Sequence, residues 1–135
     1  MKEQLLSTLK TSHAYTMAVA EAMPEDSYDY RPAGAGWNFR ELLHHVAYGI
    51  LWWEQNYIVR VQSNWDQPPA KENKNEVIHF LNEAYRSLEN TIRNRQLEVD
   101  NINGFHATIN HVTHHRGQAV VYLRCMGITP PEYTY

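Results

Sequence analysis

Apolar side chains recur at steps of three and four residues through four long segments of this chain, and breaks rich in Pro, Gly, Asn and Asp separate the segments. The segments cover residues 3–22, 38–62, 74–95 and 105–126. This spacing is typical of amphipathic helices, and no alternating apolar and polar run is long enough for a strand. Helices of roughly twenty residues, each about 30 Å long, can bury their apolar faces only by packing side by side. The sequence therefore predicts an all-α fold, a four-helix bundle.

Local signals mark the ends of several of these segments. Asn38 precedes the second segment and Glu41 follows three residues later, which is the spacing of a capping box. Residues 97–104, "LEVDNING", contain Asp, Asn and Gly, so a turn is predicted there and the fourth helix is expected to begin at Phe105. Gly127 and the pair Pro130-Pro131 end that helix.

Length and charge limit the classes of protein that this chain can be. Its 135 residues suffice for one well-packed core, so residues 1–135 are expected to form a single domain. Apolar residues make up 43% and charged residues 20%, which predicts a globular chain and not a disordered one. The formal net charge is −3 and the basic residues are scattered, so no nucleic-acid partner is expected.

The N-terminal segment and the cysteine content indicate the compartment. Glu3, Lys10 and Glu21 interrupt the N-terminal apolar pattern, which excludes a secretory signal or a membrane span there. The single cysteine, Cys125, cannot form an internal disulfide, which agrees with a reducing environment. We therefore expect a cytoplasmic protein without a membrane partner, in which Cys125 packs in the core or at an interface.

Histidines in the stretch "INHVTHHRGQ", residues 109–118, carry the strongest chemical signal. His111 and His115 are four residues apart, so on a helix their Cβ atoms lie roughly 5 to 6 Å apart on one face. Such a pair is a weak signal by itself, because many pairs lie on the surface. A third imidazole would convert it into a divalent metal site with a position left for water or substrate.

The second segment offers two candidates for the third imidazole, His44 and His45. They point about 100° apart around a helix, so at most one can face the core with the pair. His45 shares its face with Gly49, which leaves room, and with Trp52, which would form an apolar wall, whereas His44 lies on a mixed face that is typical of a flank. His45 is the better candidate, although a buried His45 bonded to a carbonyl group remains the alternative. Tyr122 lies on the same face as the pair and could line a pocket.

A carboxylate-bridged di-iron centre is the rival metal site. "ELLH" (41–44) and "EVIH" (76–79) have the Glu-x-x-His spacing of such centres, which also need a Glu from each of two further helices. Residues 105–126 contain no Asp or Glu. Capping and the helix dipole already explain Glu41 and Glu76, so the di-iron hypothesis fails on the number of ligands.

Three further residues of the signature can support the ligands. Arg116 and Gln118 could hold ring nitrogens, loop carbonyls or the Asp29 carboxylate, and His114 falls toward the flank, either behind the ligands or in solvent. Gly117 would permit the close approach of a neighbouring backbone.

Three stretches of the chain carry a resemblance to a known family: "WNFRELLHHVAY" (37–48), "INHVTHHRGQAVVYLRCMGITPPEY" (109–133) and the "YRPAGAGW" loop. Through these stretches the chain resembles the DinB-like family, which includes the YfiT-type metal-dependent hydrolases. The resemblance covers most of the chain in order; Asn38 departs from the more usual Ser or Thr, and His44 beside His45 is a second departure. It implies a four-helix bundle of unusual connectivity, commonly a homodimer, with a divalent metal held by His45, His111 and His115. This triplet is also the one that the helical geometry selects.

These observations predict a metal-dependent enzyme, with Zn or Ni as the ion, that acts on a small molecule by hydrolysis or by thiol transfer. The thiol-transfer option comes from the family resemblance. No general base is evident, since Glu41, the nearest acidic residue, already has a capping role. A metal- or ligand-binding bundle without catalysis is the alternative from a different class.

Overall fold

The computed structural model describes residues 1–135 and contains helices and irregular segments only. The fold class is therefore confirmed as all-α. No helix combines the length and the apolar character that a bilayer span requires. The four long helices are α1 (Lys2–Ala22), α2 (Phe39–Trp53), α3 (Lys74–Asn94) and α4 (Val99–Cys125), with a 3-10 turn, η1 (Glu25–Ser27), and a π-helical turn, η2 (Glu54–Val59).

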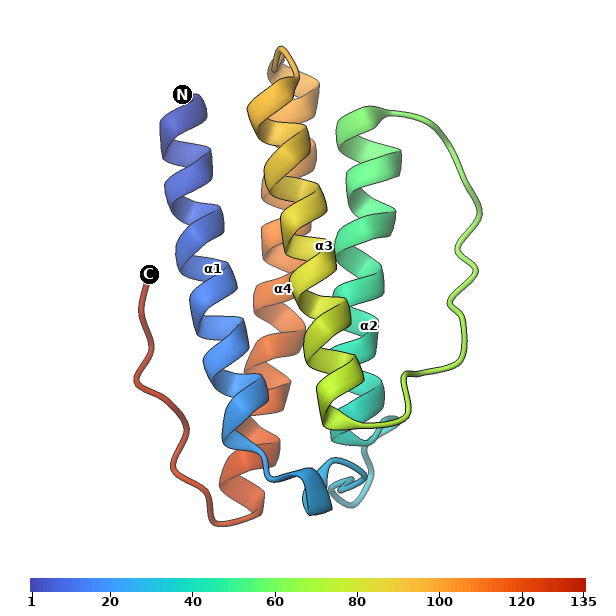
Figure 1. The fold of residues 1–135 in the computed structure, drawn as a ribbon, viewed down its shortest axis with the longest axis vertical. Coiled ribbons are helices and arrows are strands. Elements are labelled where there is room, and N and C mark those ends of the chain that lie inside the picture. The colour runs from blue at the N-terminus through green and yellow to red at the C-terminus, as the bar shows by residue number, and fades with distance from the viewer.

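The helices form a four-membered bundle in which α1 packs beside α3 and α4, and α2 packs beside the same two helices. Chain direction does not alternate from helix to helix. The helices α1 and α4 run one way, and the consecutive helices α2 and α3 both run the other way (Figure 1). The apolar stripes of all four helices meet in one buried cluster, which includes Val19, Leu42, Leu81 and Val112. The connection from α1 to α2 thus crosses a diagonal of the bundle.

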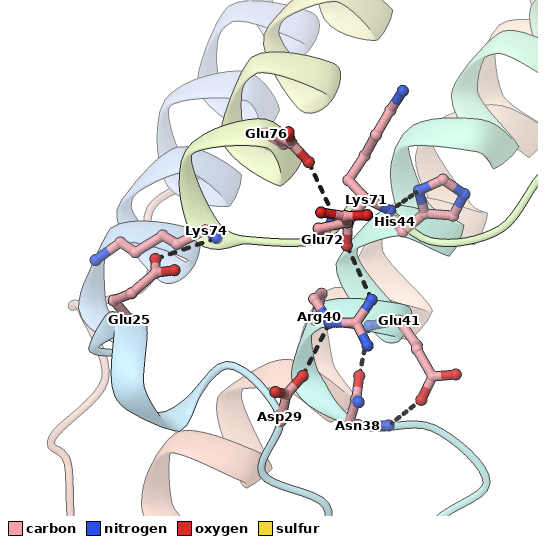
Figure 2. Close-up of polar contacts among 10 residues, drawn as sticks. All are labelled: Glu25, Asp29, Asn38, Arg40, Glu41, His44, Lys71, Glu72, Lys74 and Glu76. Atoms are coloured by element: carbon pink, nitrogen blue, oxygen red, sulfur yellow. Dashed lines mark hydrogen bonds and ion pairs between the residues drawn. The ribbon is translucent and has the colours of Figure 1, made fainter.

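Because α2 and α3 run parallel, residues 60–73 must return along the full length of the bundle, and we call this segment the strap (Figure 1). Fourteen residues of extended chain can span up to about 46 Å, which is enough to follow a helix of this length. Arg40 holds the lower end of the strap, donating to the Lys71 carbonyl at 2.9 Å while pairing with Asp29 at 2.9 Å (Figure 2).

The predicted capping box at the start of α2 is present. The Glu41 amide donates to the Asn38 side chain at 2.8 Å, and the Asn38 amide donates to the Glu41 carboxylate at 3.0 Å (Figure 2). These bonds satisfy amides that the first turn leaves free. Glu41 is thereby used at the helix start, as the sequence indicated.

The regular part of α2 ends earlier than the expected residue 62. At Glu54 the helix widens into the π-helical turn η2, and Arg60 ends it with a left-handed φ of 66°. The Glu54 carboxylate is buried and accepts hydrogen bonds from Ser87 at 2.9 Å and from Thr91. The change from α-helix to π-helix thus occurs at Glu54, where the carboxylate bonds to α3. The spacing of apolar residues in the sequence gives no sign of this change.

The prediction that α4 begins at Phe105 is wrong, because the helix starts at Val99 and includes the supposed turn. Asn101 accepts from the Glu98 amide at 2.8 Å and donates to the Ile58 carbonyl at 2.7 Å, so its turn-forming chemistry is used to cap a helix. Position 104 lies inside the helix and requires a glycine, because a Cβ there would lie 2.2 Å from the Tyr57 carbonyl oxygen. The glycine marks a close helix contact and not a chain break.

Two smaller expectations also fail. For Cys125 the expected core position is wrong, because the side chain is exposed in the last turn of α4, and packing at an interface stays a prediction. Gly117 approaches no backbone, since a Cβ there would meet nothing within 4 Å.

Candidate metal centre

Three imidazoles meet between α2 and α4, at the middle of the bundle. The Nε2 atom of His45 lies 3.2 Å from Nε2 of His111 and 3.1 Å from Nε2 of His115. One nitrogen from each ring lies within 4.8 Å of the others. The spacing of four on α4 places two rings on one face, and the neighbouring helix adds the third. The structure therefore brings together the three residues that the sequence singled out.

The outer nitrogens of two of these rings, those of His45 and His115, have partners that define which nitrogen carries the proton. Nδ1 of His45 lies 3.0 Å from the Gln67 Oε1 atom, and Nδ1 of His115 lies 2.8 Å from the Gln118 Oε1 atom. An amide oxygen only accepts, so each Nδ1 donates and each Nε2 presents a lone pair. Lone pairs facing one another at 3.1 Å repel unless a cation lies between them. This donor set fits a divalent metal ion.

His111, the third ring of the cluster, is held by packing and not by a hydrogen bond to Nδ1. Its Nδ1 is the one buried side-chain nitrogen or oxygen without a hydrogen-bond partner. A Cβ at position 49 would lie 2.6 Å from the His111 ring, so Gly49 provides the space that this imidazole occupies. The predicted room beside Gly49 exists, and it accommodates His111 of α4 and not His45 one turn earlier on α2.

Burial keeps the three imidazoles neutral. Desolvation lowers the pKa of His111 to about 4, and the neighbouring imidazoles add to this effect. Desolvation also lowers the pKa of His45 and the pKa of His115, partly offset by their hydrogen bonds to glutamine. Metal ions bind the neutral ring, so the site does not have to lose protons near neutral pH before it can coordinate.

The lowered pKa values predict how the metal-free protein responds to acid. The unfolded chain protonates its histidines near their ordinary pKa of 6.5, whereas folded His111 stays neutral down to about 4. The free energy of unfolding of chelated protein should therefore fall as the pH drops from 7 to 5. Urea unfolding at intervals of pH measures this. His111→Gln should flatten the slope and exposed His79→Ala should not; a slope that His111→Gln leaves unchanged contradicts the assignment.

Tryptophans surround the cluster, although not the one expected. The Trp37 ring centroid lies 4.4 Å from that of His45, Trp53 stacks on His111 at 4.3 Å, and Trp65 of the strap lies 5.4 Å from His45. Trp52 instead packs against Trp53 and donates to the Asn64 carbonyl at 3.1 Å. The Trp52 wall is thus replaced by its neighbour, because the helix presents residue 53 toward α4.

Tyr122 contributes indirectly to this enclosure. Its hydroxyl donates to the Trp37 carbonyl at 2.7 Å, and burial raises the pKa of this phenol. The side chain thereby holds the loop that places Trp37 beside His45 and, at 5.8 Å, beside His115. Tyr122 belongs to the neighbourhood of the site without contacting the point where the Nε2 atoms meet.

His44 is not on a flank, contrary to the prediction. It is fully buried on the side of α2 that faces the strap and α3, where its Nε2 lies 3.2 Å from the Pro68 carbonyl oxygen. Its Nδ1 accepts from the Lys71 amide at 3.3 Å (Figure 2). His44 therefore anchors the strap, while His45 alone faces α4.

The three supporting residues of the signature have different positions. Gln118 holds His115, as described above. Arg116 points away from the histidines and contacts Ser12 and Thr16 of α1, so it holds no ligand ring, and Asp29 pairs with Arg40 instead. His114 is exposed, with its ring 4.8 Å from that of His115. Neighbouring positions on α4 point in different directions, so Gln118 contacts a ligand ring, Arg116 contacts α1 and His114 faces solvent.

Sequence reasoning missed three residues at the site: Trp37, Trp65 and Gln67. All lie in irregular segments, where no periodicity indicates which way a side chain points. The strap residues come near His45 only because the chain must return along α2. A glutamine next to two prolines carries no signal by itself.

Gln118 and Gln67 provide a direct test of ligand orientation. Replacing Gln118 by Leu removes the acceptor for His115 Nδ1 and leaves the ring free to turn, so metal affinity should fall roughly 10- to 100-fold. Gln67→Leu should act likewise through His45, and exposed Gln62→Leu, in the same strap, is the matched control. Isothermal titration with Zn²⁺ measures each affinity. Equal affinities for all four proteins would mean that these bonds do not orient the ligands.

No carboxylate belongs to the cluster. The full α4 does contain one acidic residue, Asp100, which the shorter predicted helix lacked, but it pairs with Arg60 at 2.8 Å in the first turn. Glu54 is occupied by Ser87 and Thr91, and Glu41 by its capping bonds. The site offers neutral nitrogen donors inside an aromatic shell.

Fold and site together define a class of protein: a four-helix bundle with a long crossover and a partly buried three-histidine cluster that can hold a metal ion. The sequence model of the DinB family matches residues 1–135, and the chain belongs to this family.

A comparison with solved structures supports the fold assignment. A DinB-like protein from Bacillus cereus ATCC 10987 aligns with a TM-score of 0.83 at 16% sequence identity, covering 98% of this chain and 97% of that one. At this identity the likeness concerns the fold. No curated protein matches this sequence.

Proposed function

We propose that the protein is a metal-dependent enzyme that acts on a small molecule, with a divalent ion held by His45, His111 and His115. The observation that carries the proposal is the meeting of three Nε2 atoms, two of which present lone pairs because glutamine oxygens accept from Nδ1 of the same rings. Zn and Ni suit a site made of imidazoles only. When bound by three neutral histidines, such an ion acts as a Lewis acid toward water or a thiol.

The residues of the chain divide the remaining work. Gln67 and Gln118 orient two of the ligand rings, and Gly49 leaves room for the third. The indoles of Trp37, Trp53 and Trp65 lie against the histidine rings and offer apolar contact to a substrate. Hydrolysis and thiol transfer both agree with this arrangement, and the carboxylate-free donor set requires that a proton acceptor come from solvent or substrate.

The experiment compares metal-loaded and chelated protein on a panel of esters, amides and thiol-conjugation acceptors. We expect turnover that needs Zn²⁺ or Ni²⁺ and is lost in His111→Ala. Activity that survives chelation contradicts a metal mechanism. Stoichiometric metal binding without turnover on any member of the panel would replace the enzyme by the alternative, a metal-binding bundle without catalysis.

We also propose that residues 1–135 act as one DinB-like domain that assembles as a homodimer. Exposed apolar side chains on and beside the last turns of α4, Val121 at 54% and Met126 at 38%, support an interface on this part of the surface. Sedimentation velocity should give twice the chain mass, and Val121→Glu should shift the mass toward that of the monomer. A monomer at every concentration tested excludes the dimer.

A further inference from the structure

A second polar centre lies between α4 and α1, on a face of α4 that the histidines do not use. Arg116 is only 5% exposed there, and its guanidinium carbon lies 4.9 Å from the centre of the Tyr15 ring. Its Nη1 donates to the Thr16 hydroxyl at 3.2 Å and to Ser12 atoms at 3.4 Å. All of these partners are neutral.

The guanidinium has no counter-ion. None of the five ion pairs of the chain includes Arg116. A buried positive charge is costly unless a negative group is paired with it, and the planar fork of arginine matches carboxylate and phosphate oxygens in particular. Arg116 therefore requires a negative group nearby to offset the cost of burying its charge, and no negative group of the chain is paired with it.

Part of the guanidinium fork is free to meet that requirement. Only Nη1 donates hydrogen bonds within the chain, so Nε and Nη2 have no protein partner. Neither atom is sealed from solvent, because His111 Nδ1 is the one fully buried side-chain atom that lacks a partner. These two nitrogens form the edge of the fork that binds an anion through two parallel bonds.

Space for a ligand adjoins this edge. Arg116 lines two cavities, of about 480 and about 240 Å³, and Thr113 lines both. The larger volume lies within the range of about 300 to 1,000 Å³ that is typical of small-molecule sites. Arg124 adds a second positive charge to its wall, against one negative charge from Glu132.

The C-terminal segment forms one wall of the larger cavity. After α4 the chain turns back and runs beside α1 (Figure 1). The Tyr15 hydroxyl donates to the Pro131 carbonyl at 3.2 Å, and the Tyr15 and Tyr133 rings meet edge to face at 5.3 Å. One tyrosine thus contacts both the guanidinium and the covering segment, so the cavity is a built feature of the bundle.

We propose that Arg116, with Arg124 at the rim, forms a binding site for a small oxyanion, namely the carboxylate or phosphate group of a small molecule. The guanidinium edge supplies two parallel hydrogen bonds. Thr113, whose hydroxyl donates to the Ile109 carbonyl at 2.9 Å, lies beside Arg116 in the wall of both cavities. This site is separate from the three-histidine cluster and does not depend on the proposed enzymatic function.

Inorganic phosphate and acetate are the probes, titrated separately into ¹⁵N-labelled, chelated protein at constant ionic strength made up with chloride. The Arg116 Nε–H resonance and the Thr113 amide should shift saturably with at least one of the two, and which one shifts distinguishes phosphate from carboxylate recognition. Arg116→Gln should weaken binding on the order of tenfold or more, followed through Thr113, while zinc affinity stays at the wild-type value. Arg124→Gln, at the exposed rim, should weaken binding by less and keeps the test informative if Arg116→Gln does not fold.

Three results overturn the proposal. The first is the absence of a saturable shift with both anions, and the second is equal binding by wild type and Arg116→Gln. The third concerns Glu132, which could turn inward as the counter-ion of Arg116. Binding by Glu132→Gln together with none by wild type would show that the chain neutralises its own arginine.

Discussion

Single replacement of His45, His111 or His115 by alanine should abolish zinc binding, whereas His114→Ala should leave it intact. Each of the three rings contributes one Nε2 to the common point, and two imidazoles hold a divalent ion poorly. The loss should exceed the roughly 10- to 100-fold effect expected for a glutamine that only orients a ligand. Isothermal titration and metal analysis of untagged protein measure it.

His114 is the sharpest control because it lies beside His115 on the same helix but is exposed. His79, which pairs with Glu83 on the surface of α3, is a second control. Circular dichroism should show unchanged helicity in all five variants. Equal losses in the controls and in the three cluster variants would falsify the assignment of the site.

Gly104→Ala should destabilise the protein by at least about 3 kcal/mol, the upper end of ordinary overpacking. The new Cβ would lie 2.2 Å from the Tyr57 carbonyl oxygen and 2.7 Å from its carbonyl carbon, both backbone atoms. The gain of about 1 kcal/mol that alanine normally brings to a helix cannot offset this clash. Thermal unfolding should show a melting temperature lower by on the order of 10 °C.

Gly117→Ala is the matched control, since it lies in the same helix and its Cβ would meet nothing within 4 Å. It should leave stability unchanged or raise it by up to about 1 kcal/mol. If both alanine variants unfold at the wild-type temperature, η2 and α4 do not touch as closely as described. The pair separates a helix contact from the general cost of glycine in a helix.

Much of the bundle could be predicted because helix formation and capping are local. The spacing of apolar residues located α1 and α3 to within a residue or two at each end, and Asn38 with Glu41 marked the start of α2. The spacing of four between His111 and His115 also follows from helical geometry alone. These features depend on residues within a few positions of one another, so the sequence states them directly.

Contacts between distant segments decided the rest. Gly104 and Asn101 indicated a turn until packing against η2 showed why a helix needs them there. A helical wheel limited the choice to one of His44 and His45, but it placed His44 on a flank, and the return of the strap along α2 is what buries it.

Arg116 illustrates the same division. As part of the signature it suggested a partner for the ligands, yet the packing of α4 against α1 turned it toward Ser12, Thr16 and Tyr15. By itself the sequence determined where helices form and which residues share a face, because both follow from the period of the backbone. Only the tertiary structure decided what each face meets, because that depends on the order and direction in which the four helices pack.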